Sequence, residues 1–265
     1  MRLGIIGCGN MGSALVSGIL SKRVLSFSNI YVSDKDSPKT RALYKKFGIR
    51  MGTNEDVVKR CNIIVIAVKP QDSRGLLVSI SNYLDNSKHL ISIMAGVTIA
   101  RIESLIKKKI AVTRAMPNMA ALAGKGITVL SHNRMVKNEA IVHRIFSSVG
   151  EVVEINEKKM DAVTAVSGSG HAYFYYLTEA LRDAAIKLGI KKELAERLAT
   201  ATLTGSGALL ESLGDSPEAL RKRITSKKGT TEAALNVFKA KEFEKIIIET
   251  VQAAAKRSRE LSRGV

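Results

Sequence analysis

Six residues near the N-terminus have the types and the spacing of a phosphate-binding turn. They follow the pattern Gly-x-Gly-x-x-Gly and comprise Gly7, Cys8, Gly9, Asn10, Met11 and Gly12. The pattern is weak by itself, but here it follows an apolar run and precedes an amphipathic run, which is the strand–turn–helix setting that it requires. There the first glycine permits a tight turn, the second lets the backbone approach a pyrophosphate, and the third allows close helix–strand packing. The sequence therefore predicts a dinucleotide-binding turn, with a turn that binds no ligand as the alternative.

A second group of candidate ligands follows the second expected strand, at residues 30–33. An acidic residue at this place can bind the ribose hydroxyls of NAD, whereas hydroxyl and basic groups can hold the 2′-phosphate of NADP. The sequence offers both kinds, because the neighbours of Asp34 are Ser33, Lys35, Lys39 and Arg41. We therefore expect the cofactor to be NADPH or NADH and leave the choice between them open.

Further cofactor contacts are expected at the ends of other strands. Ligands of open α/β sheets bind beyond the carboxyl ends of the parallel strands. The residues at these ends are Ile6, Ala67, Val68, Lys69, Pro70 and Ala95. We predict that they touch the cofactor; for Lys69 the alternative is a solvated loop lysine.

The elements that would position these residues alternate between strand and helix in the first half of the chain. Strands are expected at residues 3–6, 30–33, 63–68, 90–94, 110–114 and 126–130. Such β-branched runs, separated by amphipathic runs, predict a parallel sheet covered on both faces, the doubly wound arrangement of the Rossmann type. After about residue 154 the strand signal almost disappears, and apolar residues recur at helical spacing between glycines that are typical helix ends, Gly189 and Gly214. We predict an α/β fold with a Rossmann-type domain at residues 1–156 and an all-α domain at residues 157–265.

Composition restricts the classes of function. The net charge is +18, but the basic residues are scattered, no aromatic residues are interleaved with them, and tryptophan is absent. A base-stacking surface for nucleic acid is therefore not expected, and the basic surface favours solubility and the attraction of anionic ligands. No apolar run reaches the length of a membrane span and no signal-peptide layout is present, so we expect no membrane association.

Cysteines and histidines give little sign of disulfide or metal chemistry. Cys8 and Cys61 both lie inside apparent elements of the α/β half, which fits a reducing cytoplasm rather than a disulfide framework. No closely spaced set of histidine, cysteine and carboxylate residues suits a metal ion, so no metal site is expected. The histidines are far apart in the sequence, at His89, His132, His143 and His171.

Over essentially its full length the chain resembles the pyrroline-5-carboxylate reductase family. The matching stretches are residues 4–12, 67–70, 95–98, 114–118, 161–164, 167–170, 225–226 and 229–231. The resemblance implies an NAD(P)H-dependent oxidoreductase acting on a C=N bond, which reduces the cyclic imine 1-pyrroline-5-carboxylate to L-proline in the last step of proline biosynthesis. It also implies that the helical domain dimerises, that the active site lies at the dimer interface, and that the protein is a homo-oligomer built from dimers.

The resemblance also implies roles for individual residues. Thr231 is expected to be the catalytic residue that hydrogen-bonds the substrate's ring nitrogen, and Asn54 is expected to contact the cofactor. The substrate carboxylate is expected near Ser226, Gly229 and Thr230, and Glu157 is expected near the substrate. The residues themselves are compatible with these roles, because residues 226–231 precede an expected helix whose free N–H groups can receive a carboxylate. For Thr230 and Thr231 the alternative is helix capping.

Three positions depart from the family pattern. The family commonly has proline and glycine at Lys227 and Lys228, proline at His171, and Thr-Pro at Met119 and Ala120. Two alternative functions therefore remain: a reductase of a related cyclic imine, and a catalytically silent nucleotide-binding regulator. A dehydrogenase of β-hydroxy acids is disfavoured, because the helix after Ser169 lacks the lysine that such an enzyme would be expected to use.

Overall fold

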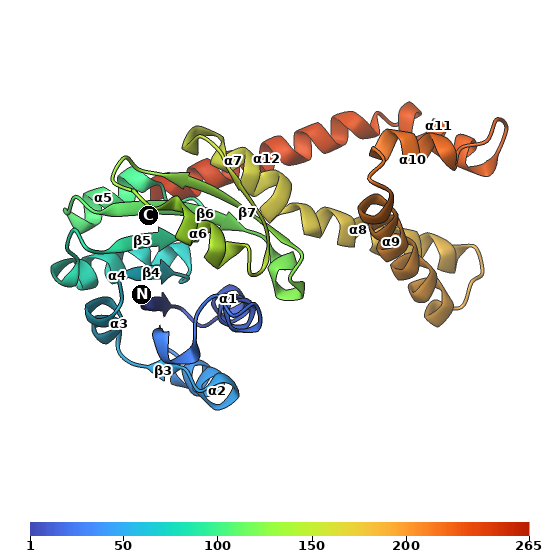
Figure 1. Ribbon diagram of the computed structural model, residues 1–265. Coiled ribbons are helices and arrows are strands. Elements are labelled where there is room, and N and C mark those ends of the chain that lie inside the picture. The colour runs from blue at the N-terminus through green and yellow to red at the C-terminus, as the bar shows by residue number, and fades with distance from the viewer. Residues whose placement is uncertain (265) are drawn as a thin grey trace. The chain divides into compact units, whose positions relative to one another are not determined.

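The computed structural model describes residues 1–264, and side chains as far as Leu261 (Figure 1). The chain divides into two compact units. Unit 1 comprises Met1–Gly168 together with the end of the last helix from Ala254, and unit 2 comprises Ser169–Ala253. Residues 157–168 belong to unit 1 because they pack against it, with Met160 and Ala165 fully buried. The boundary between the two compact units therefore lies after Gly168, whereas the change from the alternating strand–helix pattern to the helical pattern in the sequence lies near residue 156.

Unit 1 is built on a mixed sheet of eight strands in the order β3-β2-β1-β4-β5-β6-β7-β8. The strands are β1 (Leu3–Ile6), β2 (Ile30–Ser33), β3 (Arg50–Met51), β4 (Ile63–Ile66), β5 (His89–Ser92), β6 (Ala111–Pro117), β7 (Gly126–His132) and β8 (Gly150–Glu154). All neighbours are parallel except β6 and β7, which are antiparallel. The short link between β6 and β7 explains this exception, because a parallel connection needs a crossover of a dozen or more residues.

Helices cover both faces of the sheet, as the uninterrupted apolar strands predict. The helices are α1 (Asn10–Ser21), α2 (Ser37–Phe47), α3 (Asn54–Arg60), α4 (Ser73–Ile80), α5 (Ile99–Ile106) and α6 (Glu139–Phe146). Every residue of β1, β2 and β4 is buried. One apolar cluster includes Leu15 and Phe146 of α1 and α6, and the other includes Leu77 and Ile102 of α4 and α5. The predicted Rossmann-type sheet is thus confirmed.

The chain after β8 is helical. Its helices are α7 (Met160–Val163), α8 (Gly170–Lys187), α9 (Lys192–Leu213), α10 (Pro217–Arg223), α11 (Thr230–Ala240) and α12 (Phe243–Gly264). The predicted helix ends are confirmed, because Gly189 and Gly214 both adopt positive φ just after α8 and α9. No helix in the described part of the chain is long and apolar enough to cross a membrane.

Unit 2 buries very little apolar surface within one chain. Its buried apolar side chains are those of Ala195 and Ala199. Its exposed large apolar residues include Phe174, Tyr175, Tyr176, Leu188, Leu198, Leu209, Leu213, Ile224, Val237 and Ile248. Exposed apolar surface on this scale marks an association site, because a monomeric soluble protein rarely leaves so much uncovered.

Candidate functional site

The glycines of the N-terminal turn divide into two that the fold requires and one that it does not. Gly7 has φ +107°, and a Cβ there would lie 2.5 Å from the carbonyl oxygen of Ala67. A Cβ on Gly12 would lie 2.0 Å from the carbonyl oxygen of Gly7. Gly9 has φ −70°, and a Cβ there would meet no protein atom within 4 Å. The open space at Gly9, directly before the first helix, suits the close approach of a phosphate group to the backbone.

The turn is held against the end of β2 by Asp34. Its Oδ2 accepts a hydrogen bond of 2.6 Å from the N–H of Cys8, and its Oδ1 accepts one of 2.8 Å from the N–H of Asp36. Burial, followed by the negative charge of Asp34, raises the pKa of the Cys8 thiol to about 12. Cys8 therefore remains a neutral thiol inside the turn, and both oxygens of Asp34 are already engaged by the main chain.

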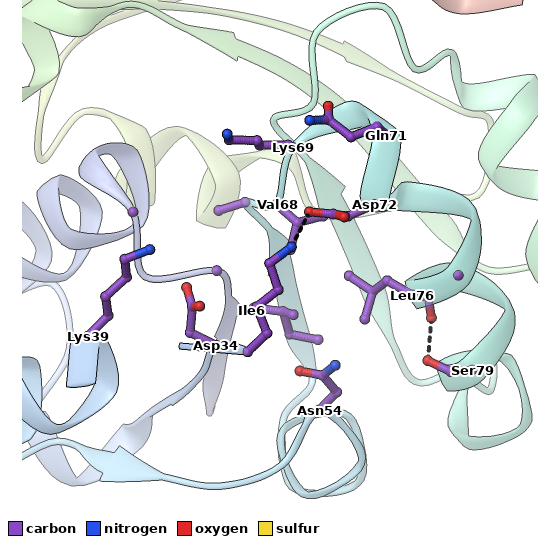
Figure 2. Close-up of a pocket in the computed structure, with 15 residues that line it drawn as sticks. Ile6, Asp34, Lys39, Asn54, Val68, Lys69, Gln71, Asp72, Leu76 and Ser79 are labelled. Atoms are coloured by element: carbon purple, nitrogen blue, oxygen red, sulfur yellow. Dashed lines mark hydrogen bonds and ion pairs between the residues drawn. The ribbon is translucent and has the colours of Figure 1, made fainter. Parts of the chain in front are cut away.

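A cavity of about 530 Å³ opens in front of the turn, at the carboxyl ends of β1 and β4 (Figure 2). This is the point at which the order of the strands reverses, where doubly wound folds bind their ligands. The predicted residues that line the cavity are Ile6, Gly7, Gly9, Asp34, Asn54, Ala67, Val68 and Lys69. The predicted residues that do not line it are Cys8, Asn10, Met11, Gly12, Ser33, Pro70 and Ala95.

One wall of the cavity was missed by the sequence analysis. It is formed by Gln71, Asp72, Gly75, Leu76 and Ser79. In Figure 2, Gln71, Asp72 and Leu76 lie opposite Asp34 and Lys39. Gln71 and Asp72 lie in the short 3-10 helix Pro70–Asp72, and the other three lie on α4. They follow Lys69 and Pro70 along the chain, so the strand-end rule that selected Lys69 could have been extended to them.

Two lysines bring positive charge to the cavity. Lys35 and Lys39 both line it and form ion pairs with Asp72 (3.0 Å) and Asp36 (3.2 Å). The hydroxyl of Ser33 instead donates to Oδ1 of Asn54 at 2.8 Å. Arg41 donates to Ser37 and does not line the cavity. Of the candidate phosphate ligands, the two lysines therefore present their charges at the cavity.

Glu157, the predicted substrate neighbour in unit 1, has main-chain and side-chain partners. Its Oε1 accepts a hydrogen bond of 2.8 Å from the N–H of Ile99, at the start of α5, and lies 3.3 Å from Nη1 of Arg114. Arg114 is almost completely buried, and its Nη2 lies 3.7 Å from Asp161. A buried guanidinium needs such partners. Arg114 therefore helps to hold Glu157 and Asp161 in place, a role that its residue type alone did not reveal.

The other predicted substrate residues lie together in unit 2, in the turn between α10 and α11. Gly229 is the N-cap of α11, and Thr230 and Thr231 are its first two residues. The N–H of Gly229 donates to the carbonyl of Ser226 at 3.0 Å, and a Cβ on Gly229 would lie 2.3 Å from the Ser226 hydroxyl oxygen. The first N–H groups of a helix have no partner within it, so this turn can receive a carboxylate. Glu157 belongs to unit 1, and this turn belongs to unit 2.

The three departures from the family pattern also have defined positions. Lys228 adopts φ +60°, and its N–H donates to Oε2 of Glu232 at 2.7 Å. His171 lies in the first turn of α8, where its ring stacks with Tyr175 at a centroid distance of 6.3 Å. Met119 begins a short 3-10 helix, Met119–Ala123. Lys228 therefore occupies a conformation that favours glycine, the residue common in the family.

The sheet order, the glycine turn and the cavity at the strand reversal define a dinucleotide-binding oxidoreductase fold of the Rossmann type. The family model described as pyrroline-5-carboxylate reductase dimerisation matches residues 157–261, and the model described as NADP oxidoreductase coenzyme F420-dependent matches residues 2–96. The chain belongs to the pyrroline-5-carboxylate reductase family.

Individual relatives agree with this assignment over nearly the whole chain. The pyrroline-5-carboxylate reductase of Synechocystis sp. is 35% identical over 99% of both chains. That of Mycobacterium leprae is 38% identical over 98% of this chain and 96% of its own. Among solved structures, pyrroline carboxylate reductase from Plasmodium falciparum with NADP bound has a TM-score of 0.85 and 32% identity, covering 99% of this chain and 98% of its own. The enzyme from Coxiella burnetii has a TM-score of 0.91 and 30% identity, covering 98% of each.

Proposed function

We propose that this protein is an NADPH-dependent oxidoreductase that reduces the C=N bond of 1-pyrroline-5-carboxylate to form L-proline. The observation that carries the proposal is membership of the family across both units, with relatives at 35% and 38% identity over 98–99% of the chain. The cavity supports it independently, because Gly9 leaves open the space that a pyrophosphate needs.

The charges of the cavity favour NADPH over NADH. Both carboxylate oxygens of Asp34 hold main-chain N–H groups, so they are less available to the ribose hydroxyls that distinguish NAD. Lys35 and Lys39 supply ammonium groups for a 2′-phosphate. The pyrroline carboxylate reductase from Plasmodium falciparum was solved with NADP bound, which supports the same choice.

The turn at the start of α11 is proposed to hold the substrate. The N–H of Thr230 and the hydroxyl of Ser226, which lie on either side of Gly229 in this turn, would bind the carboxylate of pyrroline-5-carboxylate. The hydroxyl of Thr231 would donate a hydrogen bond to the ring nitrogen, which must gain a proton when the imine carbon is reduced. When bound, the reduced nicotinamide supplies the hydride for that carbon. Glu157 remains a proposed neighbour of the substrate through its position beside Arg114 and α5.

The apolar surface of unit 2 is proposed to be covered by a second copy of the chain. The matching family model describes dimerisation and spans residues 157–261, the helical domain that the sequence predicts. Large apolar side chains exposed on α8, α9 and α12 would form the core of such an interface. We further propose a larger homo-oligomer built from these dimers, and a cytoplasmic location, which fits the free buried cysteines.

A matrix assay of cofactors and substrates tests the proposed function. Purified protein would be given NADPH or NADH with either pyrroline-5-carboxylate or the six-membered cyclic imine, and cofactor oxidation would be followed by absorbance. We expect the highest kcat/KM with NADPH and pyrroline-5-carboxylate. Faster turnover of the six-membered ring would instead identify a reductase of a related imine. NADPH binding without turnover of either imine would identify a nucleotide-binding regulator.

A further inference from the structure

Three histidines that are far apart in the sequence meet around β7 and β8 in unit 1. His89 begins β5, His132 ends β7, and His143 lies on α6. The fully buried hydroxyl of Thr113 links two of them, because its Oγ1 lies 2.7 Å from Nε2 of His89 and 2.7 Å from Nδ1 of His132. The His132 ring is therefore held in one orientation through its Nδ1.

The other nitrogen of His132 faces two carboxylates. The His132 side chain is only 9% exposed, and its Nε2 is buried without a hydrogen-bond partner among the described residues. Oε1 of Glu154 lies 3.6 Å from this Nε2. Three possible ligand atoms, one each from His132, Glu139 and Glu154, all lie within 4.8 Å of one another. A buried polar atom without a partner is costly, so its position beside two acidic groups points to an occupant.

The hydrogen bonds around Thr113 are compatible with a lone pair on Nε2 of His132. The Thr113 hydroxyl has one proton, so it can accept from Nδ1–H of His132 and donate to Nε2 of His89. In this arrangement the ring proton of a neutral His132 sits on Nδ1, and Nε2 presents the lone pair that a metal ligand needs.

We propose that His132, Glu139 and Glu154 bind a divalent transition-metal ion, with Zn²⁺ as the reference ion, through Nε2 and one oxygen from each carboxylate. Imidazole and carboxylate are ligands that Zn²⁺ accepts, and three protein ligands leave a coordination position for water. The Thr113 contact then has the role of the outer hydrogen bond that orients a ligating histidine. Nε2 of His143 donates to Oε1 of Glu154 at 2.5 Å and would orient that carboxylate.

The position of the cluster defines what the ion would do. The three ligands come from the end of β7, the start of α6 and the end of β8, so one ion would join these elements at the sheet edge. A hollow of about 510 Å³ lies beside them and is lined in part by all three ligands, which leaves room for the ion and its water. Glu139 by itself would not indicate a metal site, because a carboxylate at the first residue of a helix is favourable even when no ligand is bound. The buried Nε2 of His132, which has no hydrogen-bond partner among the described residues, distinguishes this cluster from an ordinary pair of exposed carboxylates.

Isothermal titration of Zn²⁺ into tag-free, EDTA-treated protein tests this site. We expect one Zn²⁺ per chain, and an unfolding temperature that rises by several degrees when the ion is in large excess over its Kd. Glu139→Gln should weaken binding by about tenfold or more, because it removes the charge of one ligand at an exposed position. Glu151→Gln is the matched control, since Glu151 is an exposed carboxylate on β8 outside the cluster.

Titration with Co²⁺ provides a second readout that is independent of stability. Binding should produce visible absorption bands that disappear in Glu139→Gln and in His132→Asn but remain in Glu151→Gln. Should His132→Asn fail to fold, Glu139→Gln decides the question by itself. The proposal is overturned if the wild-type protein binds neither ion, or if Glu139→Gln binds as well as Glu151→Gln.

Discussion

The main-chain N–H of Cys8 donates a hydrogen bond of 2.6 Å to Oδ2 of Asp34, which joins the glycine turn to the end of β2. The other oxygen of the same carboxylate accepts from the N–H of Asp36. Asp34 therefore shapes the phosphate-binding turn from outside the glycine pattern. This relationship gives Asp34 a role that is independent of which nicotinamide cofactor binds.

Asp34→Ala is expected to raise KM for NADPH and for NADH alike. The substitution removes two hydrogen bonds to a charged acceptor, each worth about 1.5–3 kcal/mol, so a loss of about tenfold or more in apparent cofactor affinity is expected. Steady-state kinetics with each cofactor would measure it. Asp85→Ala is the control, because the exposed carboxylate of Asp85 also accepts a main-chain N–H, that of Ser87, and does not line the cavity. A selective loss of NADH alone would show instead that Asp34 reads the ribose.

Thr231→Ala is expected to lower turnover and to leave cofactor affinity nearly unchanged. The variant loses the hydroxyl proposed to hydrogen-bond the ring nitrogen, and the expected fall in kcat is about tenfold or more. Thr231→Ser keeps a hydroxyl at the same place on α11 and should retain most of the activity. Equal kcat values for the alanine variant and the wild-type enzyme would remove Thr231 from the mechanism.

Lys228→Gly is expected to stabilise the protein. Lys228 has φ +60°, and this conformation costs a residue with a Cβ roughly 1–2 kcal/mol. The extra chain entropy of glycine offsets about 0.4–1 kcal/mol of the gain, so the free energy of unfolding should rise by about 1 kcal/mol or less. Urea unfolding at fixed protein concentration would measure the change. Lys227→Gly, at a neighbour without positive φ, should be neutral or destabilising. A destabilised Lys228→Gly would contradict the assigned strain.

Leu209→Asp is expected to disrupt the proposed dimer. Leu209 lies on α9 and is 51% exposed in the single chain. If a second copy covers it, an aspartate there would be buried without a partner, which costs several kcal/mol. Light scattering at fixed concentration should show a smaller species than for the wild-type protein. Lys192→Asp changes charge at an exposed position on the same helix and should leave the mass unchanged. An unaltered mass for Leu209→Asp would place the interface elsewhere.

Stability should fall in weak acid because of His89. Its pKa is lowered to about 4 in the folded protein, mainly by burial, whereas an unfolded histidine titrates near about 6.5. Between these values the unfolded chain binds more protons, so the free energy of unfolding decreases as the pH falls from about 6.5 to about 4. His89→Gln should show a shallower decline when both proteins are unfolded with urea in EDTA. The aspartates and glutamates are the same in both proteins, so their contribution to the pH dependence cancels in the comparison. Parallel pH profiles of the two proteins would exclude His89 as the cause of the decline.

Local sequence patterns predicted the elements whose burial is uniform. The continuous apolar runs of β1, β2 and β4 are buried along their whole length and were identified directly. The strands β3 and β8 were not predicted, because β3 is two exposed residues long and β8 has only two apolar side chains, between Glu151 and Glu154, and no buried residue. Strand β7 was predicted as a strand, but its antiparallel direction follows from the short link to β6.

The residues of this chain by themselves determined the glycine turn, the order of the elements and the family, because these depend on residue type and on spacing along the chain. Only the tertiary structure decided which side chains meet. It placed Asp34 on the amide of Cys8, Glu157 beside Arg114, Asp72 and Leu76 across the cavity from Asp34, and His132 beside Glu139 and Glu154. Each of these contacts joins segments from different elements, and hydrophobic periodicity sets the face of an element without naming its partner.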